Sequence, residues 1–417
     1  MNWMTPMTKY PPVWQGGSIV ALSSLFYLYE FFLRVSPTVI THELMHHFSI
    51  DALQLSFIAS AFYIGYTPMQ IPAGKLCNQF NLRYILATAM AASSLACLCF
   101  SLTDSYLMAI VWRIVIGILS AFAFVGPLML TRRMLEAKYF AITTGLIQFS
   151  GCLGATIGLE PFSQANKLFG WQTTLGYTAM IGLIIALIFV ILIKDEHNLT
   201  SPEEPSHASG FILLKDKQIW MIAINAFCCW APIAILGELW GVKLIDLKWS
   251  GGLKPEITMN YFWLGVAIAS PLAGWLSDRI QSRKKPLKLC FILSFIGSVV
   301  LIYFPAISTT LEKCLLFTIG ASVAAQTLTF AMVNDYCPDN MAGFAYGFNN
   351  VAVISSGILL PPISGFILTM VSDGNQINGV PFYSLENFMH GLAILPIISI
   401  VGIISSHLVT ETYRANA

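Results

Sequence analysis

Two stretches that lie 200 residues apart decide the fold of this chain. Residues 62–76 read FYIGYTPMQIPAGKL, and residues 262–276 read FWLGVAIASPLAGWL. Five of the fifteen aligned positions hold the same residue, namely Phe62/Phe262, Gly65/Gly265, Ala73/Ala273, Gly74/Gly274 and Leu76/Leu276. Similarity at a fixed interval is typical of a repeated architecture. We therefore expect a chain built from two homologous halves.

The composition places these halves in a membrane. Of the 417 residues, 56% are hydrophobic and only 10% are charged, whereas soluble domains carry about 25% charged residues. So few charges exclude an ordinary soluble protein and make the lipid bilayer an expected partner. The net charge of +1 and the lack of a basic cluster argue against a nucleic-acid partner.

The apolar runs give the number of spans. A membrane-spanning helix needs about 20 mostly apolar residues. We find twelve such runs, near 18–40, 52–74, 83–103, 106–130, 140–162, 172–193, 218–244, 257–276, 287–308, 312–333, 343–370 and 387–408. The predicted fold class is an all-α membrane protein with twelve transmembrane helices in two homologous six-helix bundles. The predicted units are an N-terminal bundle (1–194), a cytoplasmic linker (195–217) and a C-terminal bundle (218–417).

The distribution of basic residues predicts the orientation. With both termini inside, fifteen of the 22 Lys and Arg residues fall on the cytoplasmic side and five on the outside. Cytoplasmic loops of membrane proteins carry such an excess. Two arginines, Arg34 and Arg113, fall within the membrane.

Four short motifs carry a family resemblance. GWLSDRIQSRKK (274–285) resembles the loop signature of the major facilitator superfamily, and GKLCNQFNLRY (74–84) is its degenerate twin. RIVIG (113–117) and GWQ (170–172) are similar to two further family motifs. The resemblance implies a transporter that works by alternating access. It also implies a conformational motif made of Gly74, Asn78, Arg83, Gly274, Asp278, Arg279 and Arg283.

The chemistry of these loops follows from their residue types. Glycine lets a helix end pack closely against a neighbour. Asp278 can accept hydrogen bonds from a neighbouring helix N-terminus, where negative charge is favoured. In the first copy Asn78 stands where the family has Asp, so that copy lacks the charge.

Polar residues inside the predicted helices point to a binding site. An ionisable group at the centre of a membrane helix costs about 2.5–3.5 kcal/mol on insertion scales, yet the first helix holds Glu30 and Arg34, four residues apart on one face. We expect polar stripes to line a wet central cavity. The substrate-binding candidates are Tyr27, Tyr63, Tyr66, Gln70, Gln148, Asn225, Gln326 and Asn349.

Glu30, Arg34 and Arg113 are the candidates for proton coupling. Glu30 and Arg113 are expected at similar depth, and the family resemblance implies that an arginine of the fourth helix faces a proton site in the first. The hypothesis is that Arg34 or Arg113 holds Glu30 ionised until substrate or a proton arrives. The alternative is an ion pair within the first helix that only neutralises two charges. Glu160 and Glu238 are expected nearer the outside, as gate candidates.

One further motif weighs against this interpretation. HELMH (42–46) fits the zinc-protease pattern His-Glu-x-x-His, which gives a membrane metalloprotease as an unlikely alternative. It lies in a short predicted outer loop with no evident substrate cleft. No nucleotide-binding loop, nucleophile–base set or cofactor motif is present, so we expect a protein that is not an enzyme and needs no metal or cofactor.

The predicted function is secondary active transport of a small polar solute (an amino acid, short peptide or organic anion). Coupling to protons is favoured because buried carboxylates can load and release protons. Uptake is favoured because the fifth helix lacks the Gly-Pro signature of the family's drug/proton antiporters. The stretch FYLYEFFLRVSP (26–37) resembles intraphagosomal amino-acid transporters, and relatives of the lysosomal dipeptide transporter are a weaker match. A proton-driven effluxer of a small molecule or siderophore and a non-transporting sensor stay open. We expect a monomer in a bacterial inner membrane, with both termini cytoplasmic.

Overall fold

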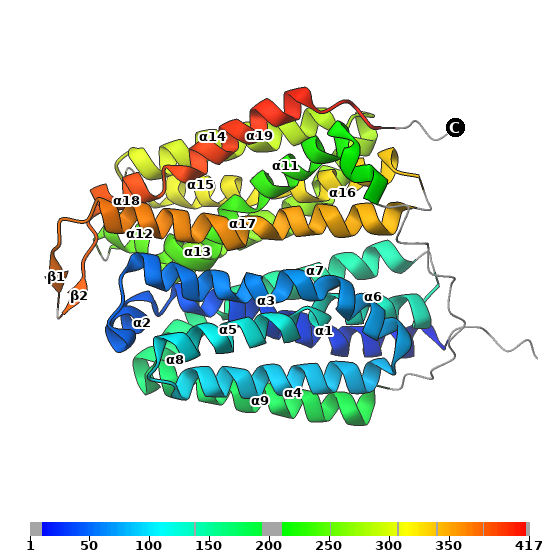
Figure 1. Cartoon of the computed structure of the whole chain (residues 1–417), viewed down its shortest axis with the longest axis horizontal. Coiled ribbons are helices and arrows are strands. Elements are labelled where there is room, and N and C mark those ends of the chain that lie inside the picture. The colour runs from blue at the N-terminus through cyan, green and yellow to red at the C-terminus, as the bar shows by residue number, and fades with distance from the viewer. Residues whose placement is uncertain are drawn as a thin grey trace, which may run out of the picture.

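The computed structural model describes residues 11–136, 139–193, 211–250, 252–306, 308–338, 341–377 and 379–413. Most of the predicted linker, residues 195–210, lies outside these ranges, and so does the side chain of Asn78. Residues 211–217 of the linker form the short 3₁₀ helix η3 (Phe211–Lys215) and the start of α11. Figure 1 shows two helical layers, one made by each half of the chain.

Six rods make up the N-terminal half, where a rod is one helix or two successive helices that form one span. Three of the rods are interrupted. Their helices are α1 (Val13–Val35), η1 (Ser36–Thr38), α2 (Thr41–Phe48), α3 (Ala52–Gln79), α4 (Leu82–Leu102), α5 (Tyr106–Ser120), α6 (Phe122–Met134), α7 (Phe140–Ile157), α8 (Glu160–Phe169) and α9 (Trp171–Leu192).

The C-terminal half repeats this order. Its helices are α11 (Lys217–Pro232), the π-helical segment η4 (Ile233–Trp240), α12 (Gly241–Trp249), α13 (Pro255–Arg279), α14 (Lys284–Tyr303), α15 (Thr309–Ser322), α16 (Ala325–Tyr336), α17 (Ala342–Met370), α18 (Leu385–Gly391) and α19 (Ile394–Leu408). The strands β1 (Gln376–Ile377) and β2 (Val380–Pro381) form a small antiparallel hairpin.

The twelve-helix architecture predicted from the sequence is confirmed. Among the described residues, ten continuous or joined helices are long and apolar enough to cross a membrane. The rod α3 qualifies only together with α2, across a bend of 110°. The remaining rod, α13, is its counterpart at the 200-residue interval, and both contain internal proline: Pro68 and Pro72, and Pro271.

The repeated stretches are the places where helices pack most closely. A Cβ atom at Gly65 in α3 would lie 2.1 Å from the carbonyl oxygen of Ile114 in α5. A Cβ at Gly265 in α13 would lie 2.2 Å from the carbonyl oxygen of Phe317 in α15. Both positions therefore require glycine, because two backbones meet there.

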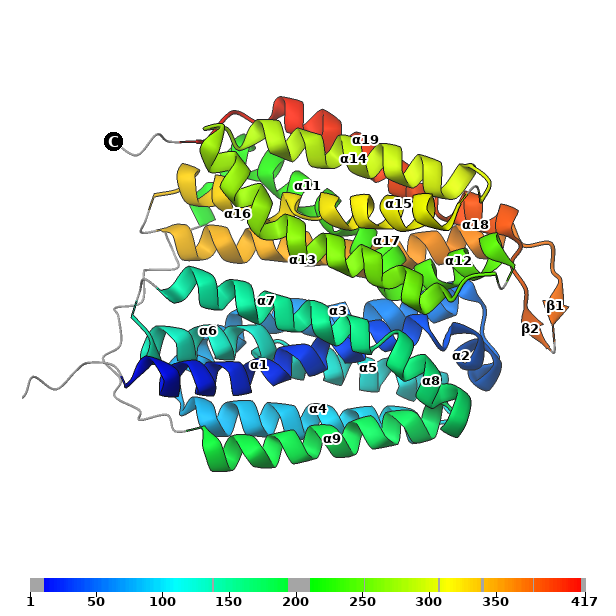
Figure 2. The ribbon, with the colours of Figure 1, turned by 180° about the vertical axis from the view of Figure 1, so that it is seen from behind.

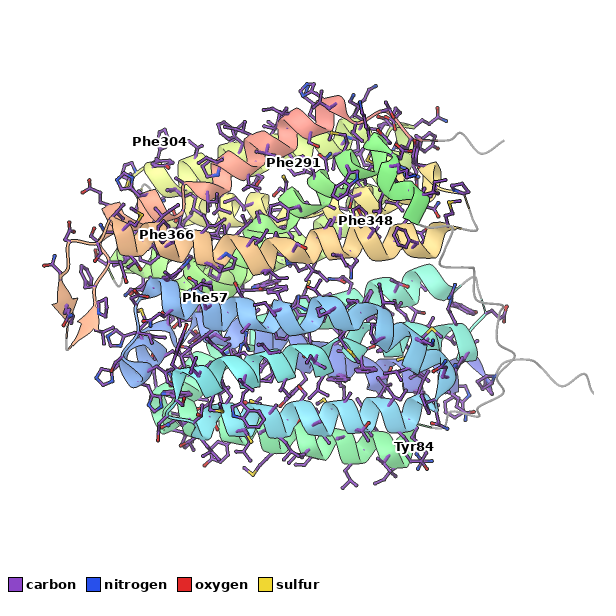
Figure 3. All side chains as sticks on the ribbon, in the orientation of Figure 1. Phe57, Tyr84, Phe291, Phe304, Phe348 and Phe366 are labelled. Carbon is purple, nitrogen blue, oxygen red and sulfur yellow. The ribbon has the colours of Figure 1, made fainter. Side chains whose placement is uncertain are left out.

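The two ends of the molecule differ, and Figures 1 and 2 show them from opposite sides. The hairpin end carries β1, β2, α2, α8, α12 and α18. At the termini end α1 begins and α19 ends. The outer faces of the rods expose large apolar side chains such as Phe57, Tyr84 and Phe366 (Figure 3). An apolar exterior around a core with buried polar groups fits a lipid environment.

Candidate functional site

Four side chains from both halves form a buried cluster. We call Glu30, Arg34, Tyr63 and Glu238 the central charge cluster. Arg34 Nη2 donates a hydrogen bond to Glu30 Oε1, and Arg34 Nη1 lies 3.9 Å from Glu238 Oε1. Tyr63 donates its hydroxyl proton to Glu238 Oε2 over 2.5 Å. The cluster thus joins α1 and α3 of one half to η4 of the other.

The cluster is sealed from solvent. The exposed fractions of Glu30, Arg34 and Glu238 are 0%, 4% and 4%. The expectation of an open, wet cavity around these groups does not match this burial. Aromatic rings surround the guanidinium: Arg34 Cζ lies 4.5–5.4 Å from the ring centroids of Phe31, Phe62, Tyr63 and Tyr66. Such rings stabilise a cation through their negative faces.

Several polar atoms of the cluster have no hydrogen-bond partner. They are Glu30 Oε2, Arg34 Nε and Glu238 Oε1. An unpaired buried polar atom costs free energy of about 1–3 kcal/mol, and more when the group is charged. A proton would neutralise a carboxylate, and an anionic ligand would accept from Arg34 Nε, so the unpaired atoms suit the binding of both.

Arg113 lies beside the part of α1 that holds Glu30, but its hydrogen bonds go to backbone groups. It is 3% exposed and donates to the carbonyl oxygens of Leu33 (2.9 Å) and Ile58 (3.3 Å). Its guanidinium therefore joins the backbones of α1 and α3. The hydrogen bond to Glu30 is made by Arg34 instead.

The substrate-binding candidates separate into two groups. Tyr63 belongs to the central charge cluster, and the ring of Tyr66 lies 5.2 Å from Arg34 Cζ. Tyr27 donates to Gln148 Oε1 over 3.3 Å. Gln70 accepts from Asn350 across the two halves, also over 3.3 Å. These residues extend the polar region from the cluster toward the termini end.

The second group stays within the C-terminal half. Asn225 donates to Met221 O (2.7 Å) and to Ser405 Oγ in α19 (2.9 Å). Asn349 donates to Thr329 Oγ1 over 3.2 Å, and Gln326 is half-buried in α16. Asn225 and Asn349 thus join helices of one bundle and are not brought to the central charge cluster.

Glu238 is the member of the cluster that the sequence analysis held only as a gate candidate nearer the outside. The 200-residue interval pairs it with Thr38, one helical turn beyond Arg34. Thr38 itself donates to the Leu239 carbonyl over 2.8 Å.

A match to a protein-family model shows the family of this chain. The model described as Major Facilitator Superfamily matches residues 20–362 and also residues 222–410. The chain belongs to the major facilitator superfamily. It is therefore a membrane transporter of this superfamily by descent and not an enzyme, as the sequence predicted.

Known relatives in the superfamily are distant in sequence, and their names give different solutes or a sensor role. A probable hexose phosphate transport protein of Chlamydia muridarum is 20% identical over 66% of this chain and 67% of its own length. The hexuronate transporter of Bacillus subtilis is 23% identical over 77% and 80%. A membrane sensor protein of Escherichia coli is 20% identical over 78% and 79%.

Solved structures of the superfamily show the same fold. A bacterial homologue of the human lysosomal transporter Spinster, in an inward-facing and occupied conformation, aligns with a TM-score of 0.78 at 13% identity, over 94% of this chain and 96% of that one. The nucleoside transporter NupG aligns with a TM-score of 0.72 at 12% identity, over 94% and 98%.

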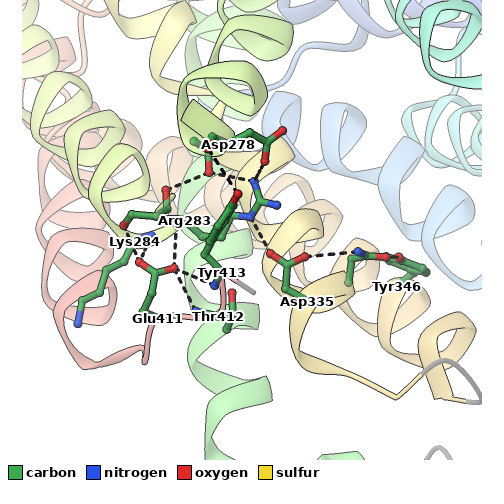
Figure 4. A network of polar contacts seen from close by, with 11 residues as sticks. Asp278, Arg283, Lys284, Asp335, Tyr346, Glu411, Thr412 and Tyr413 are labelled. Atoms are coloured by element: carbon green, nitrogen blue, oxygen red, sulfur yellow. Dashed lines mark hydrogen bonds and ion pairs between the residues drawn. The ribbon is translucent and has the colours of Figure 1, made fainter. Parts of the chain in front are cut away.

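The conformational motif of the superfamily is charged in the second half. Arg283 Nη1 donates to Asp278 Oδ1 over 2.6 Å, and Arg283 Nε donates to Asp335 Oδ2 over 2.7 Å (Figure 4). Asp278 thus binds a guanidinium, where a helix N-terminus was expected. Arg279 lies outside this group, with its Cζ atom 5.4 Å from the Trp275 ring.

In the first half, two hydrogen bonds at the corresponding loop involve backbone groups. Arg133 Nη2 donates to the Cys77 carbonyl over 2.7 Å, and the Arg83 N–H donates to Asn81 Oδ1 over 3.0 Å. Gly74 and Gly274 do not make the close approach expected of them. A Cβ at Gly74 would meet nothing within 4 Å, and one at Gly274 would have its nearest neighbour at 4.0 Å.

The HELMH segment forms α2 at the hairpin end. His42, Glu43, His46 and His47 border a surface pocket of about 320 Å³. Glu43 accepts a hydrogen bond from Asn166, and His47 Nε2 lies 3.2 Å from Asp104 Oδ1. In the described part of the chain, no three His, Cys, Asp or Glu side chains are placed to hold a metal ion.

Proposed function

We propose that this transporter carries out proton-coupled uptake of a small organic anion, with the central charge cluster as its binding and coupling site. The observation behind the proposal is the position of Arg34 between two carboxylates, Glu30 from one half and Glu238 from the other. In this proposal the anion binds at Arg34, and the proton is carried by Glu30.

The charge balance of the site supports such coupling. With Glu30 and Glu238 ionised, they balance Arg34 and Arg113. A proton on Glu30 would leave one uncompensated positive charge in a buried site, which is costly by several kcal/mol. An arriving anion would remove that cost. Proton and anion therefore favour each other's binding, which is the thermodynamic condition for symport.

The position of Glu238 supports a link between binding and alternating access. Its carboxylate on the second half touches Tyr63 and faces Arg34 on the first half. An anion that engages Arg34 would compete with Glu238 and weaken this contact between the halves. A ligand shifts a conformational equilibrium only through such differential contacts.

The relatives agree with an anionic solute. Hexose phosphates and hexuronates, named in two relatives, are both organic anions. Amino acids and short peptides also carry a carboxylate that Arg34 would accept, so they belong in the same test. The bacterial relatives and the excess of basic residues on the termini side favour a bacterial inner membrane with cytoplasmic termini. We expect a monomer, because each polypeptide contains both halves of the site.

Uptake into proteoliposomes tests the proposal. The panel contains glucose 6-phosphate, glucuronate, alanine and dialanine, each with and without a pH gradient, acidic outside. We expect at least one anion to accumulate only with the gradient, and Arg34→Ala to lose both binding and uptake. The control is Glu312→Gln, which removes an equally buried carboxylate paired with Lys248 far from the cluster. Accumulation without a gradient, or gradient-driven export, would reject the proposal.

The match to a membrane sensor protein makes a sensor the second candidate. A sensor would bind one of the panel compounds at the cluster without moving it across the membrane. Binding measured by calorimetry together with no uptake in the proteoliposomes would favour this alternative.

A further inference from the structure

Residues 410–413 fold back onto the loop between α13 and α14. Gln218 of α11 holds Thr410 in two directions: its amide donates to the Thr410 carbonyl and its Oε1 accepts from the Thr410 N–H, both over 3.0 Å. This attachment places Glu411 against residues 282–284 (Figure 4). We call residues 411–413 the tail.

Glu411 adds a second capping group at the start of α14. The side chain of Arg283, the residue before α14, makes no capping hydrogen bond, and Ser282 Oγ accepts from Lys285 N over 3.2 Å. The Glu411 carboxylate accepts from Ser282 Oγ (2.5 Å), Arg283 N (2.8 Å) and Lys284 N (3.3 Å). The first N–H groups of a helix have no partner within it, and negative charge is favoured there. The tail thus completes the start of α14.

The protonation state of Glu411 suits this role. Burial raises its pKa, but hydrogen bonds from Ser282 and from the N–H groups of Arg283, Tyr413 and Lys284 outweigh burial and leave the pKa below its ordinary value. Glu411 is therefore ionised at neutral pH and acts as an acceptor with both oxygens.

The same carboxylate also turns the tail over Arg283. It accepts from Thr412 N (3.1 Å) and Tyr413 N (3.0 Å). The Tyr413 ring then lies 5.0 Å from Arg283 Cζ, and its hydroxyl is 3.5 Å from the Asp278 carbonyl. Arg283, whose guanidinium joins Asp278 to Asp335, is therefore held at both ends. Glu411 binds its backbone N–H, and the Tyr413 ring covers the face of its guanidinium.

We propose that the tail is a working part of the conformational motif, in which Glu411 and Tyr413 are positioning residues for Arg283. They hold its guanidinium between Asp278 on α13 and Asp335 on α16, and so set the balance between the conformations of the transporter. This role is independent of the solute and of the central charge cluster.

A distance measurement without solute tests the role. Spin labels at Leu192 (α9) and Ile404 (α19), both exposed, report the separation of the halves in a background whose nine cysteines are replaced. We expect Glu411→Gln and Tyr413→Ala to change the ratio of the long- and short-distance populations at least two-fold. Tyr413→Phe keeps the ring, and Asp373→Asn removes an exposed carboxylate at the hairpin end, so both controls should match the parent.

The Arg283→Ala background decides whether the tail acts through Arg283. There, Glu411→Gln and Tyr413→Ala should add no further change. An unchanged ratio in both tail variants would overturn the proposal, and so would an equal shift with and without Arg283. Should Glu411→Gln not fold, Tyr413→Ala gives the same decision, because it leaves the α14 cap intact.

Discussion

The two halves share their packing but differ in their charges. Gly65 and Gly265 bring α3 and α13 equally close to α5 and α15. At the same interval, Glu30 corresponds to Trp230, Arg34 to Ala234, and Thr38 to Glu238.

The differing positions nevertheless meet in space. Trp230 Nε1 donates to Tyr63 OH over 3.2 Å, beside Glu238. The repeated positions therefore build the scaffold, and the positions that diverged build the site. The loops also differ, since α4 is capped by Asn81, whereas α14 is capped by Ser282 together with Glu411 of the tail.

The largest expected effect distinguishes the two carboxylates. Glu30→Gln should abolish pH-driven accumulation while exchange between equal pools of solute continues, because Glu30 is fully buried and hydrogen-bonded directly to Arg34. Glu238→Gln should retain some accumulation, because its oxygen is 3.9 Å from Arg34. Uptake of the best panel compound, with and without a pH gradient, measures both. If Glu238→Gln lost accumulation and Glu30→Gln kept some of it, Glu238 of the second half would be the proton carrier.

The next effect tests whether the scaffold is truly equivalent in the halves. Gly65→Ala and Gly265→Ala should each destabilise the protein by about 1–3 kcal/mol, because a Cβ would collide with a backbone carbonyl in a packed interface. Thermal unfolding in detergent should show similar losses for both. The control is Gly145→Ala in α7, where a Cβ would meet nothing within 4 Å. A loss in only one half would contradict equal packing.

The loops should give a smaller and unequal effect. Asp278→Asn should slow turnover several-fold with little change in affinity, because it removes one of the two acidic partners of Arg283. Asn78→Asp in the other loop should be tolerated. Initial rates over a range of solute concentrations separate turnover from affinity. An affinity loss at normal turnover for Asp278→Asn would place that residue in solute binding instead.

Much of this could be read from the sequence, for physical reasons. Glycine at a backbone crossing has no substitute, so the repeat at 62–76 and 262–276 survives and identifies the fold. Glu30 and Arg34 stand out because charges are costly in a membrane helix. The partners of Arg113 and Asp278 could not be read, because backbone carbonyls and a distant arginine leave no local signal.

The hydrogen bond of Glu238 left no local signal in the sequence, because its partner Tyr63 lies 175 residues away in the chain. The termini-end contacts of the tail were also beyond local sequence reasoning, since Glu411 and Arg283 are 128 residues apart in the chain.

The smallest expected effect concerns the HELMH segment, where the halves also differ. At the 200-residue interval His42 and His46 of α2 correspond to Val242 and Asp246 of α12, so the second half builds the same helix without histidine. Position 46 lies on an exposed face, and Glu43 already accepts from Asn166.

The double variant His42→Ala/His46→Ala should therefore leave expression and uptake as in the parent. Its free energy of unfolding should stay within about 0.5 kcal/mol of the parent's, as is usual for surface substitutions. A chelator should be equally without effect. The comparison to make is with His47→Ala, because His47 contacts Asp104 and the Trp171 ring and so joins α2 to α9. That variant should lower the unfolding temperature, whereas a loss of uptake on chelation would show that α2 binds a functional metal ion.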